Sequence, residues 1–225
     1  ENDGDFRSSE SIELLQEADI VVTNPPFSLF REYVSQLIEH DKKFVIIGNK
    51  NAITYKEIFK CFKANQMWVG NTPMSTDMLF SVPEEFAKEL VETKKKGSGY
   101  KIVNGEVKGR AQAVWFTNLD FAKRHEDLLL FQTYSPEKYP RYDNYDAINV
   151  SKTKDIPLDF GGVMGVPITF LDKHNPDQFE LLGMSASAGY DKSVVGIPFL
   201  GERDARPLVG GKNTYARVFI KNKKL

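Results

Sequence analysis

One segment organises this chain of 225 residues: Ala18-Asp19-Ile20-Val21-Val22-Thr23-Asn24-Pro25-Pro26-Phe27. The run 18–23, which is rich in β-branched residues, predicts a buried strand of a parallel sheet. The following residues, 28–38, carry apolar side chains at helical spacing. The tetrapeptide at 24–27 therefore lies where a strand ends and a helix begins. Open α/β sheets bind their ligands at this edge.

The two prolines restrict the backbone and remove two N–H donors. We therefore expect the carbonyl oxygens of Asn24 and Pro25 to point out of the sheet edge instead of entering a ladder. With the side-chain oxygen of Asn24, they form a set of fixed acceptors beside the flat ring of Phe27. Such a site suits a planar ligand that carries an NH2 group, such as adenine. The same acceptors would favour the positively charged nitrogen that forms when this amine is alkylated.

The alternative interpretation is a turn that merely ends the strand, because Asn and Pro both favour turns. At average residue usage, this tetrapeptide with Phe or Tyr last arises by chance in roughly one chain in several hundred of this length. Its position after a hydrophobic strand makes a chance occurrence rarer still. The pattern therefore favours a binding site.

Asn24-Pro25-Pro26-Phe27 resembles the catalytic motif of adenine-N6 methyltransferases that use S-adenosylmethionine. The wider context, residues 4–10 and 20–28, resembles the EcoRI-type DNA adenine methylase family, and the resemblance extends to Tyr215-Ala216-Arg217-Val218-Phe219-Ile220. The tetrapeptide alone is shared with glutamine and RNA methyltransferases, so the longer match is the more specific one. The resemblance implies a site-specific methyltransferase of a restriction-modification system, acting on an adenine extruded from double-stranded DNA.

The resemblance also implies roles for single residues. Asn24, Pro25, Pro26 and Phe27 would be catalytic, with Asn24 and Pro25 accepting from the amine and Phe27 stacking on the base. In the family an acidic–aromatic pair contacts the adenine of the cofactor, S-adenosylmethionine. We assign this role to Asp5 and Phe6, with Asp3 as an alternative to Asp5, and place Asn24 at the cofactor as well. Otherwise Asp5 is an acid that flanks a helix.

A further aromatic pair lies in the predicted strand 112–119. In this class of enzymes an aromatic residue here packs on the extruded base from its other side. Trp115 and Phe116 point to opposite faces of a strand, so at most one of them contacts the base and the other is core. We favour Phe116 for the base.

The first half of a cofactor-binding sheet is missing from this sequence. Such a domain normally begins with a strand, a Gly-rich turn and a second strand that ends in an acid, and nothing before Asp5 supplies them. The Gly-rich run 159–165 would fit a permuted order, but 166–171 predicts a strand and not a helix, and glycines between strands are usually turns. We therefore expect this chain to be the C-terminal part of a longer protein.

The predicted fold is α/β: a partial Rossmann-like methyltransferase sheet, followed by a smaller, irregular, β-rich target-recognition region. We place the catalytic domain at 1–120 and the target-recognition and DNA-binding region at 121–225. Helices are predicted at 9–17, 28–40, 54–65 and 84–95. Strands are predicted at 18–23, 43–49, 67–70, 78–82 and 112–119, and in the second half at 168–171, 179–182 and 215–220.

Positive charge gathers in two places despite a net charge of −1, and a Tyr-rich segment is a third candidate for contact with nucleic acid. The last twenty-five residues are basic, which suits phosphates or merely a solvated tail. Residues 94–99 predict a flexible loop that Lys101, Lys108 and Arg110 keep positive; such a loop fits DNA phosphates, and equally an ordinary surface loop. The segment 134–145 is rich in Tyr and contains Arg141, which suits either a nucleic-acid groove or a surface loop.

Composition excludes several classes of protein. Hydrophobic and charged fractions of 41% and 27% are those of a globular protein, and no apolar run is long enough to span a bilayer. The single cysteine, Cys61, excludes an internal disulfide framework, so we expect a cytoplasmic protein. His40, His125 and His174 share no ligand spacing with Cys61, so no metal site is expected. We expect a monomer.

Two other functions remain open from sequence. The first is a non-catalytic DNA-binding fragment that retains recognition without a cofactor site. The second is a methyltransferase that acts through the same acceptors on RNA or on a glutamine of a protein. The basic C-terminal region and the Phe at the end of the motif favour DNA.

Overall fold

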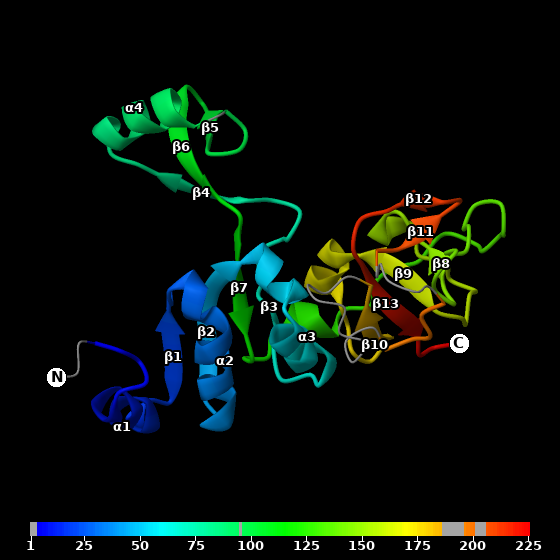
Figure 1. The fold of residues 1–225 in the computed structure, drawn as a ribbon, viewed down its shortest axis with the longest axis horizontal. Coiled ribbons are helices and arrows are strands. Elements are labelled where there is room, and N and C mark those ends of the chain that lie inside the picture. Colours follow the sequence, from blue (N-terminus) through cyan, green and yellow to red (C-terminus); the bar gives the residue numbers. More distant parts are fainter. Residues whose placement is uncertain (1–3, 95, 186–195, 201–205) are drawn as a thin grey trace.

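The computed structural model describes residues 4–94, 96–185, 196–200 and 206–225. It is a mixed α/β structure in which the described strands form separate sheets (Figure 1). A four-stranded sheet, β1-β2-β7-β3, lies in the first half of the chain, and a second four-stranded sheet, β10-β13-β9-β8, lies in the second half. A three-stranded sheet, β4-β6-β5, and a hairpin, β11-β12, complete the set.

The first sheet has the strand–helix–strand order expected from sequence. Strand β1 (Ile20–Thr23) runs parallel to β2 (Lys43–Asn49), and the chain between them forms a short 3-10 helix, η1 (Phe27–Leu29), and then α2 (Phe30–Glu39). After β2 come η2 (Lys50–Thr54), α3 (Lys56–Lys63) and β3 (Trp68–Val69). Strand β7 (Ala113–Thr117) lies antiparallel between β2 and β3. Helix α1 (Ser9–Glu17) precedes β1, and the Ser8 hydroxyl caps it.

One face of this sheet carries the core. Along β2 the burial alternates, and Phe44, Ile46 and Gly48 turn towards α2 and α3. A Cβ atom on Gly48 would lie 2.5 Å from the Phe30 ring and 2.9 Å from the Phe116 ring, so only glycine fits this position. The helices therefore pack closely on the strand that follows the candidate site.

A lobe of residues 78–111 stands apart from the first sheet (Figure 1). It contains β4 (Met78–Ser81), α4 (Glu84–Thr93), β5 (Tyr100–Val103) and β6 (Glu106–Ala111). The loop predicted at 94–99 precedes β5, and its described residues lie outside the named helices and strands. Lys101, Lys108 and Arg110 lie beyond it, in the hairpin that β5 and β6 form. Asn104 and Gly105 connect the two strands with φ angles of 51° and 83°, the combination that a two-residue type I′ turn requires.

The second half is built on β8 (Ile148–Asn149), β9 (Met164–Pro167), β10 (Phe179–Met184) and β13 (Arg217–Asn222). Strands β11 (Leu208–Val209) and β12 (Lys212–Asn213) form the hairpin, and short 3-10 helices lie at η3 (Ala122–His125), η4 (Thr153–Asp155) and η5 (Ile168–Lys173). The strands predicted near 179–182 and 215–220 are confirmed.

The strand predicted at 168–171 was wrong, because these residues lie in η5. The strand comes earlier, at β9, where it pairs with β13. After Pro167 the chain turns, and Phe170 and Leu171 become buried. A short apolar run without alternation does not distinguish a strand from a buried helical turn. Here the residues form a helical turn, which buries Phe170 and Leu171.

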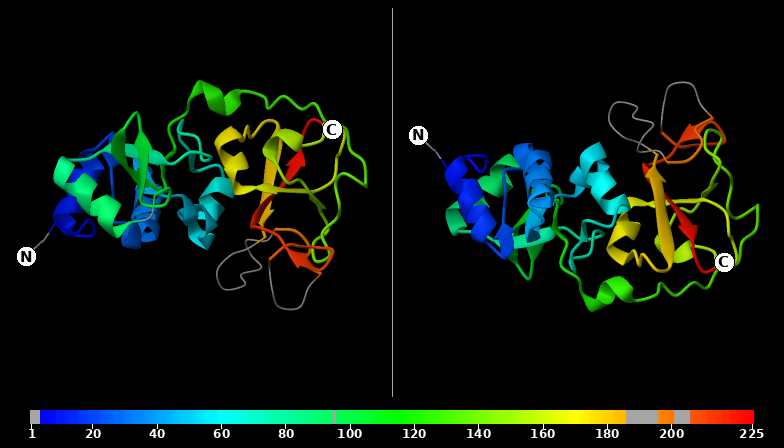
Figure 2. Two further views of the ribbon diagram at one scale, coloured as in Figure 1. Left: turned by 90° about the horizontal axis from the view of Figure 1, so that it is seen from above. Right: turned by 90° about the horizontal axis from the view of Figure 1, so that it is seen from below.

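The two halves share one core. A single cluster of buried side chains includes Phe62 and Met74 from the first half and Phe170 and Phe179 from the second. Helix α3 packs against β10, and β3 packs against η5. Both views of Figure 2 show the cyan α3 next to the yellow segment that contains η5. Among the helices that the structure describes, none is long and apolar enough to cross a membrane.

Candidate active site

The acceptors of Asn24 and Pro25 lie free at the end of β1. Strand β1 stops at Thr23, and the N–H group of Leu29 donates to the Pro26 carbonyl at 3.0 Å, which closes the 3-10 turn. Within the described residues, no backbone N–H group donates to the carbonyl oxygen of Asn24 or Pro25. The Asn24 side chain is exposed and forms no hydrogen bond with another described residue.

The local sequence explains why these oxygens stay free. Neither Pro25 nor Pro26 has an N–H group to continue the ladder with β2. A residue that precedes proline is held extended, which applies to both Asn24 and Pro25. The ring of Phe27 is 43% exposed beside them. The motif therefore presents the exposed Asn24 and the flat ring of Phe27 beside the carbonyl of the buried Pro25, to which no described backbone N–H group donates, the arrangement that suits a planar amine.

A cluster of charges that the sequence did not reveal lies near this edge. Lys50 directly follows β2, and its Nζ atom lies 2.8 Å from the Met74 carbonyl and 3.1 Å from Asp77. Arg110, from β6, pairs with the other oxygen of Asp77. Burial raises the pKa of the Asp77 carboxyl, but the hydrogen bonds from Lys50 and Arg110 outweigh it and leave the pKa lowered. Tertiary contacts alone bring these three residues together.

Asp5 and Phe6 pack on α2. The Asp5 carboxylate accepts from the backbone N–H group of Arg7 at 2.8 Å and from its guanidinium at 3.0 and 2.7 Å. The hydrogen bonds from Arg7 lower the pKa of Asp5 to about 2. The Phe6 ring meets Tyr33 edge-on at 5.1 Å, and its carbonyl accepts from the Gln36 amide. No hydrogen bond among the described residues joins this pair to Asn24. Asp3 lies outside the described residues.

The surroundings of Phe6 fit a purine. A hollow of about 390 Å³ opens beside β1, lined by Phe6, Tyr33 and Val21 among others. The Gln36 Oε1 atom at its wall is buried and accepts no hydrogen bond from any described residue. Asp5 has accepted three hydrogen bonds, and a carboxylate has sites for about four. A flat ring and the Gln36 acceptor in the hollow, with the Asp5 carboxylate next to Phe6 in the chain, match an adenine that carries an amine.

The two aromatic residues of β7 do point to opposite faces of the sheet. Phe116 is completely buried, with its ring centroid 5.1 Å from that of Phe30 and 6.2 Å from that of Phe62. Trp115 is half-buried on the other face, against Gly70. Our preference for Phe116 at the base is therefore corrected: Phe116 is a core residue, and Trp115 is the one with exposed surface.

The Tyr-rich segment 134–145 was expected to offer aromatic side chains to a groove or to be a surface loop. Tyr139, Tyr142 and Tyr145 are instead buried. Tyr142 and Tyr145 form a second small core with Phe219. Arg141 lies at the surface, paired with Asp146. This segment supports the packing of the second half.

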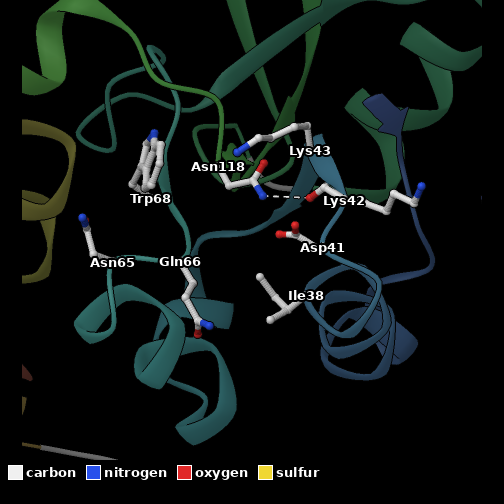
Figure 3. A pocket seen from close by; sticks show the side chains of 8 residues that line it. All are labelled: Ile38, Asp41, Lys42, Lys43, Asn65, Gln66, Trp68 and Asn118. Carbon is white, nitrogen blue, oxygen red and sulfur yellow. Dashed lines mark hydrogen bonds between the residues drawn. The ribbon is translucent and has the colours of Figure 1, made fainter. Parts of the chain in front are cut away.

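A second polar hollow, of about 190 Å³, lies at the opposite edge of the first sheet (Figure 3). Asn118 lines this hollow. Its side-chain amide donates a hydrogen bond to the Lys42 carbonyl at 2.8 Å and accepts one from the Phe44 N–H group at 2.9 Å. The amide is thus occupied in joining two strands. Among the described residues no group of three His, Cys, Asp or Glu side chains could hold a metal. Burial raises the pKa of the Cys61 thiol, which makes it unreactive.

The comparisons with known proteins agree on one family. The model of the family described as "Adenine-specific methyltransferase EcoRI" matches residues 1–223. Type II methyltransferase M.EcoRI of Escherichia coli is 51% identical over 225 residues, which are 99% of this chain and 63% of the relative. Type II methyltransferase M.MpnI of Mycoplasma pneumoniae is 42% identical over 231 residues, which are 98% of this chain and 69% of the relative.

A third relative, Type II methyltransferase M.MgeORF184P of Mycoplasma genitalium, is 41% identical over 230 residues, which are 99% of this chain and 70% of the relative. This chain thus spans 63% to 70% of the length of these three relatives. No solved structure matches the chain.

Proposed function

The chain belongs to the EcoRI family of adenine-specific methyltransferases, and from this premise we propose that it acts within a DNA adenine-N6 methyltransferase of a restriction-modification system. The substrate in this proposal is an adenine extruded from double-stranded DNA. The observation that carries the proposal is the set of free oxygens on Asn24 and Pro25 beside the exposed ring of Phe27.

In the proposed reaction, Phe27 stacks on the extruded base and holds it at the sheet edge. The oxygens of Asn24 and Pro25 accept the two hydrogens of the N6 amine and so orient its lone pair. S-adenosylmethionine, when bound, supplies an electrophilic methyl group. As positive charge grows on the nitrogen, the two acceptors stabilise it. No general base is needed before the attack, so positioning and two hydrogen bonds provide most of the catalysis.

The cofactor residues in this proposal are Asp5, Phe6 and Asn24. Phe6 supplies a ring for the adenine of S-adenosylmethionine to pack on, and Asp5 supplies an acceptor for its amine. The ion pair with Arg7 keeps the Asp5 carboxylate charged and oriented. Gln36 adds a buried acceptor next to Phe6. Trp115 takes the place of Phe116 as the candidate for the other side of the base.

The proposal keeps the division into a catalytic domain at 1–120 and a target-recognition region at 121–225. It also places the upstream strands of a Rossmann-like sheet on the free edge of β1. Two observations support this: β1 pairs on one side only within the described residues, and Ile20 and Val22, on one face of it, are 49% and 68% exposed and thus uncovered. A strand of a parallel sheet is normally covered on both faces.

The test uses the full-length protein, S-adenosylmethionine and plasmid DNA, with methylated bases mapped one by one. We expect N6-methyladenine at one recognition sequence. Asn24→Ala should lower the rate by at least about 100-fold, the effect of losing one preorganised hydrogen-bond group, while binding to duplex DNA stays close to wild type. Asn51→Ala is the matched control, because Asn51 is an exposed asparagine whose side chain forms no hydrogen bond with a described residue.

Three results would contradict the proposal. Full activity of Asn24→Ala would discard the mechanism. Methylation of RNA or of a protein glutamine, with DNA left unmodified, would discard the substrate. Binding of DNA by the full-length protein without binding of S-adenosylmethionine would identify a non-catalytic DNA-binding module.

A further inference from the structure

We propose that one face of the β4-β6-β5 sheet contacts the phosphate backbone of the DNA duplex. The inference rests on the proposed function and deepens it, since it names a surface that holds the substrate outside the active site. We call this surface the open face; it consists of Leu79, Ser81, Lys101, Val103, Glu106, Lys108 and Arg110. It belongs to the lobe of residues 78–111, which stands beyond the end of the first sheet (Figure 1).

The strand register shows which residues of the β4-β6-β5 sheet lie on the face that α4 covers and which lie on the opposite face. A Cβ atom on Gly109 would lie 3.1 Å from Val82 and 3.8 Å from Leu90 of α4, so the Gly109 face is the one that α4 covers. Lys108 and Arg110 flank Gly109 along β6 and point to the opposite side. Lys101 and Ser81 are the partners of Lys108 on the two neighbouring strands and point to that side as well. These cations therefore lie on the face without a helix.

Two like charges lie directly opposite each other on the open face. Lys101 and Lys108 are paired in the β5–β6 ladder, an arrangement that destabilises a sheet unless an anion balances it. Lys108 donates to Glu106 at 2.6 Å and to the Ser81 hydroxyl at 3.1 Å. Lys101 is exposed and pairs with no acid among the described residues. The lysine row thus keeps an unbalanced charge, and a phosphate between the two side chains would neutralise it.

The other side of the lobe has the opposite charge. Helix α4 carries four exposed glutamates, namely Glu84, Glu85, Glu89 and Glu92. Lys88, on the same helix, is paired with Glu84 at 2.8 Å. A lobe with an acidic helix on one side and basic strands on the other turns its strands towards a polyanion and its helix away from it. The charge distribution therefore selects both the partner and the face that meets it.

The lobe is anchored at the edge of the sheet that carries the candidate site. Lys50 follows β2 as Asn24 follows β1, and Asp77 joins Lys50 to Arg110 at the foot of the open face. Since the single carboxylate of Asp77 pairs with two cations, Lys50 and Arg110, this cluster keeps a net positive charge. The side chains of all three are at most 17% exposed, which makes this a firm attachment. A duplex with one base extruded towards Asn24 would pass within reach of such a lobe.

The experiment measures how the full-length protein binds a fluorescein-labelled DNA duplex between about 50 and 200 mM salt. Each phosphate contact contributes about 0.9 to the slope of log affinity against log salt concentration. Because one phosphate lies between the two side chains, we expect Lys101→Gln with Lys108→Gln to lower that slope by about 0.9 and to weaken binding. The charge-retaining pair Lys101→Arg with Lys108→Arg should keep the wild-type slope, which shows that charge and not folding is responsible. Lys88→Gln on α4 is the matched control and should leave the slope unchanged.

An unchanged slope in the double glutamine variant would overturn the inference, even if the protein methylates DNA normally. A lower slope in Lys88→Gln would overturn it too, because the acidic side would then be the one in contact. Inhibition of binding by polyglutamate as strong as that by DNA would indicate a protein partner instead. The proposed function fails separately, if the wild-type protein binds the duplex and leaves it unmethylated. Wild-type protein that does not bind a duplex would refute both.

Discussion

The guanidinium carbon of Arg124 lies 3.6 Å from the centre of the Trp68 ring system. Trp68 belongs to β3 of the first sheet, and Arg124 lies in η3, in the segment that leads to the second half. The Arg124 side chain is 8% exposed and also donates to the Asn65 side chain. The indole N–H group donates to the Leu119 carbonyl at 3.1 Å. This stack fixes the direction in which the chain leaves the first sheet.

Arg124→Ala should lower the free energy of unfolding by about 2 kcal/mol, the contribution of a desolvated cation–π contact. Arg124→Lys should fall between the wild type and the alanine variant, because an ammonium keeps the charge but not the planar stack. Urea unfolding followed by tryptophan fluorescence measures both. An alanine variant as stable as the wild type would show that the stack does not hold the two halves together.

Asp77→Asn should loosen the lobe. The substitution leaves the mostly buried cations Lys50 and Arg110 without their carboxylate, and an uncompensated charge of this kind costs about 2–4 kcal/mol. Hydrogen exchange should become faster at the β6 amides. Asp19→Asn is the control, because Asp19 is exposed and forms no ion pair with a described residue. Unchanged exchange in Asp77→Asn would mean that the hydrophobic contacts alone hold the lobe in place.

His174 should make stability depend on pH between about 6.5 and 4. Burial lowers the pKa of His174 to about 4, and the Phe179 carbonyl lies 2.9 Å from its Nε2 atom. Below pH 6.5 the unfolded chain takes up a proton that the folded protein does not, so stability falls as the pH falls. The loss reaches up to about 3 kcal/mol near pH 4 and then stops, since both states are protonated.

Urea midpoints across this pH range, compared between the wild type and His174→Gln, isolate the contribution of His174, because carboxylates titrate alike in both proteins. The glutamine variant should lose less stability than the wild type on acidification. Parallel curves for the two proteins would show that His174 titrates normally.

Gly105→Ala should destabilise the β5–β6 hairpin by about 1 kcal/mol, because a φ of 83° strains a residue with a Cβ atom. Asn104→Gly should be tolerated, since glycine adopts a positive φ without strain. Amide exchange in β5 and β6 measures the local effect. Equal protection in Gly105→Ala and the wild type would mean that the turn rearranges at no cost.

The hairpin illustrates how far local sequence reaches. Asn104-Gly105 between two strand-like runs is a strong hairpin signal, yet from the sequence we predicted only the loop before it, at 94–99. The turn chemistry was decisive because it fixes the register of β5 and β6 and so places Lys101 opposite Lys108. At 168–171 the reverse holds: the apolar run is compatible with a strand, and only the burial of Phe170 and Leu171 selects a 3-10 turn.

The residues of the candidate site also fall into two groups, those that the sequence predicts and those that only the structure identifies. Asn24 and Phe27 could be predicted because two prolines after a β-branched strand act on the local backbone, whatever the rest of the chain does. The choice between Trp115 and Phe116 could not, since a strand shows that they oppose each other but not which face the helices cover. Phe30 and Phe62 settle that choice by packing on Phe116.

The sequence by itself determined the strand–motif–helix unit at 20–39, the order of the first sheet's helices and the free acceptors at Asn24, because short-range sterics and hydrophobic period fix these features. Only the tertiary structure decided that one core crosses residue 120, that Tyr139, Tyr142 and Tyr145 are buried, and that Lys50, Asp77 and Arg110 meet. These contacts join residues that are separated by 27 to more than 100 positions in the sequence. No local pattern encodes which distant apolar surfaces will pack against each other and be removed from water.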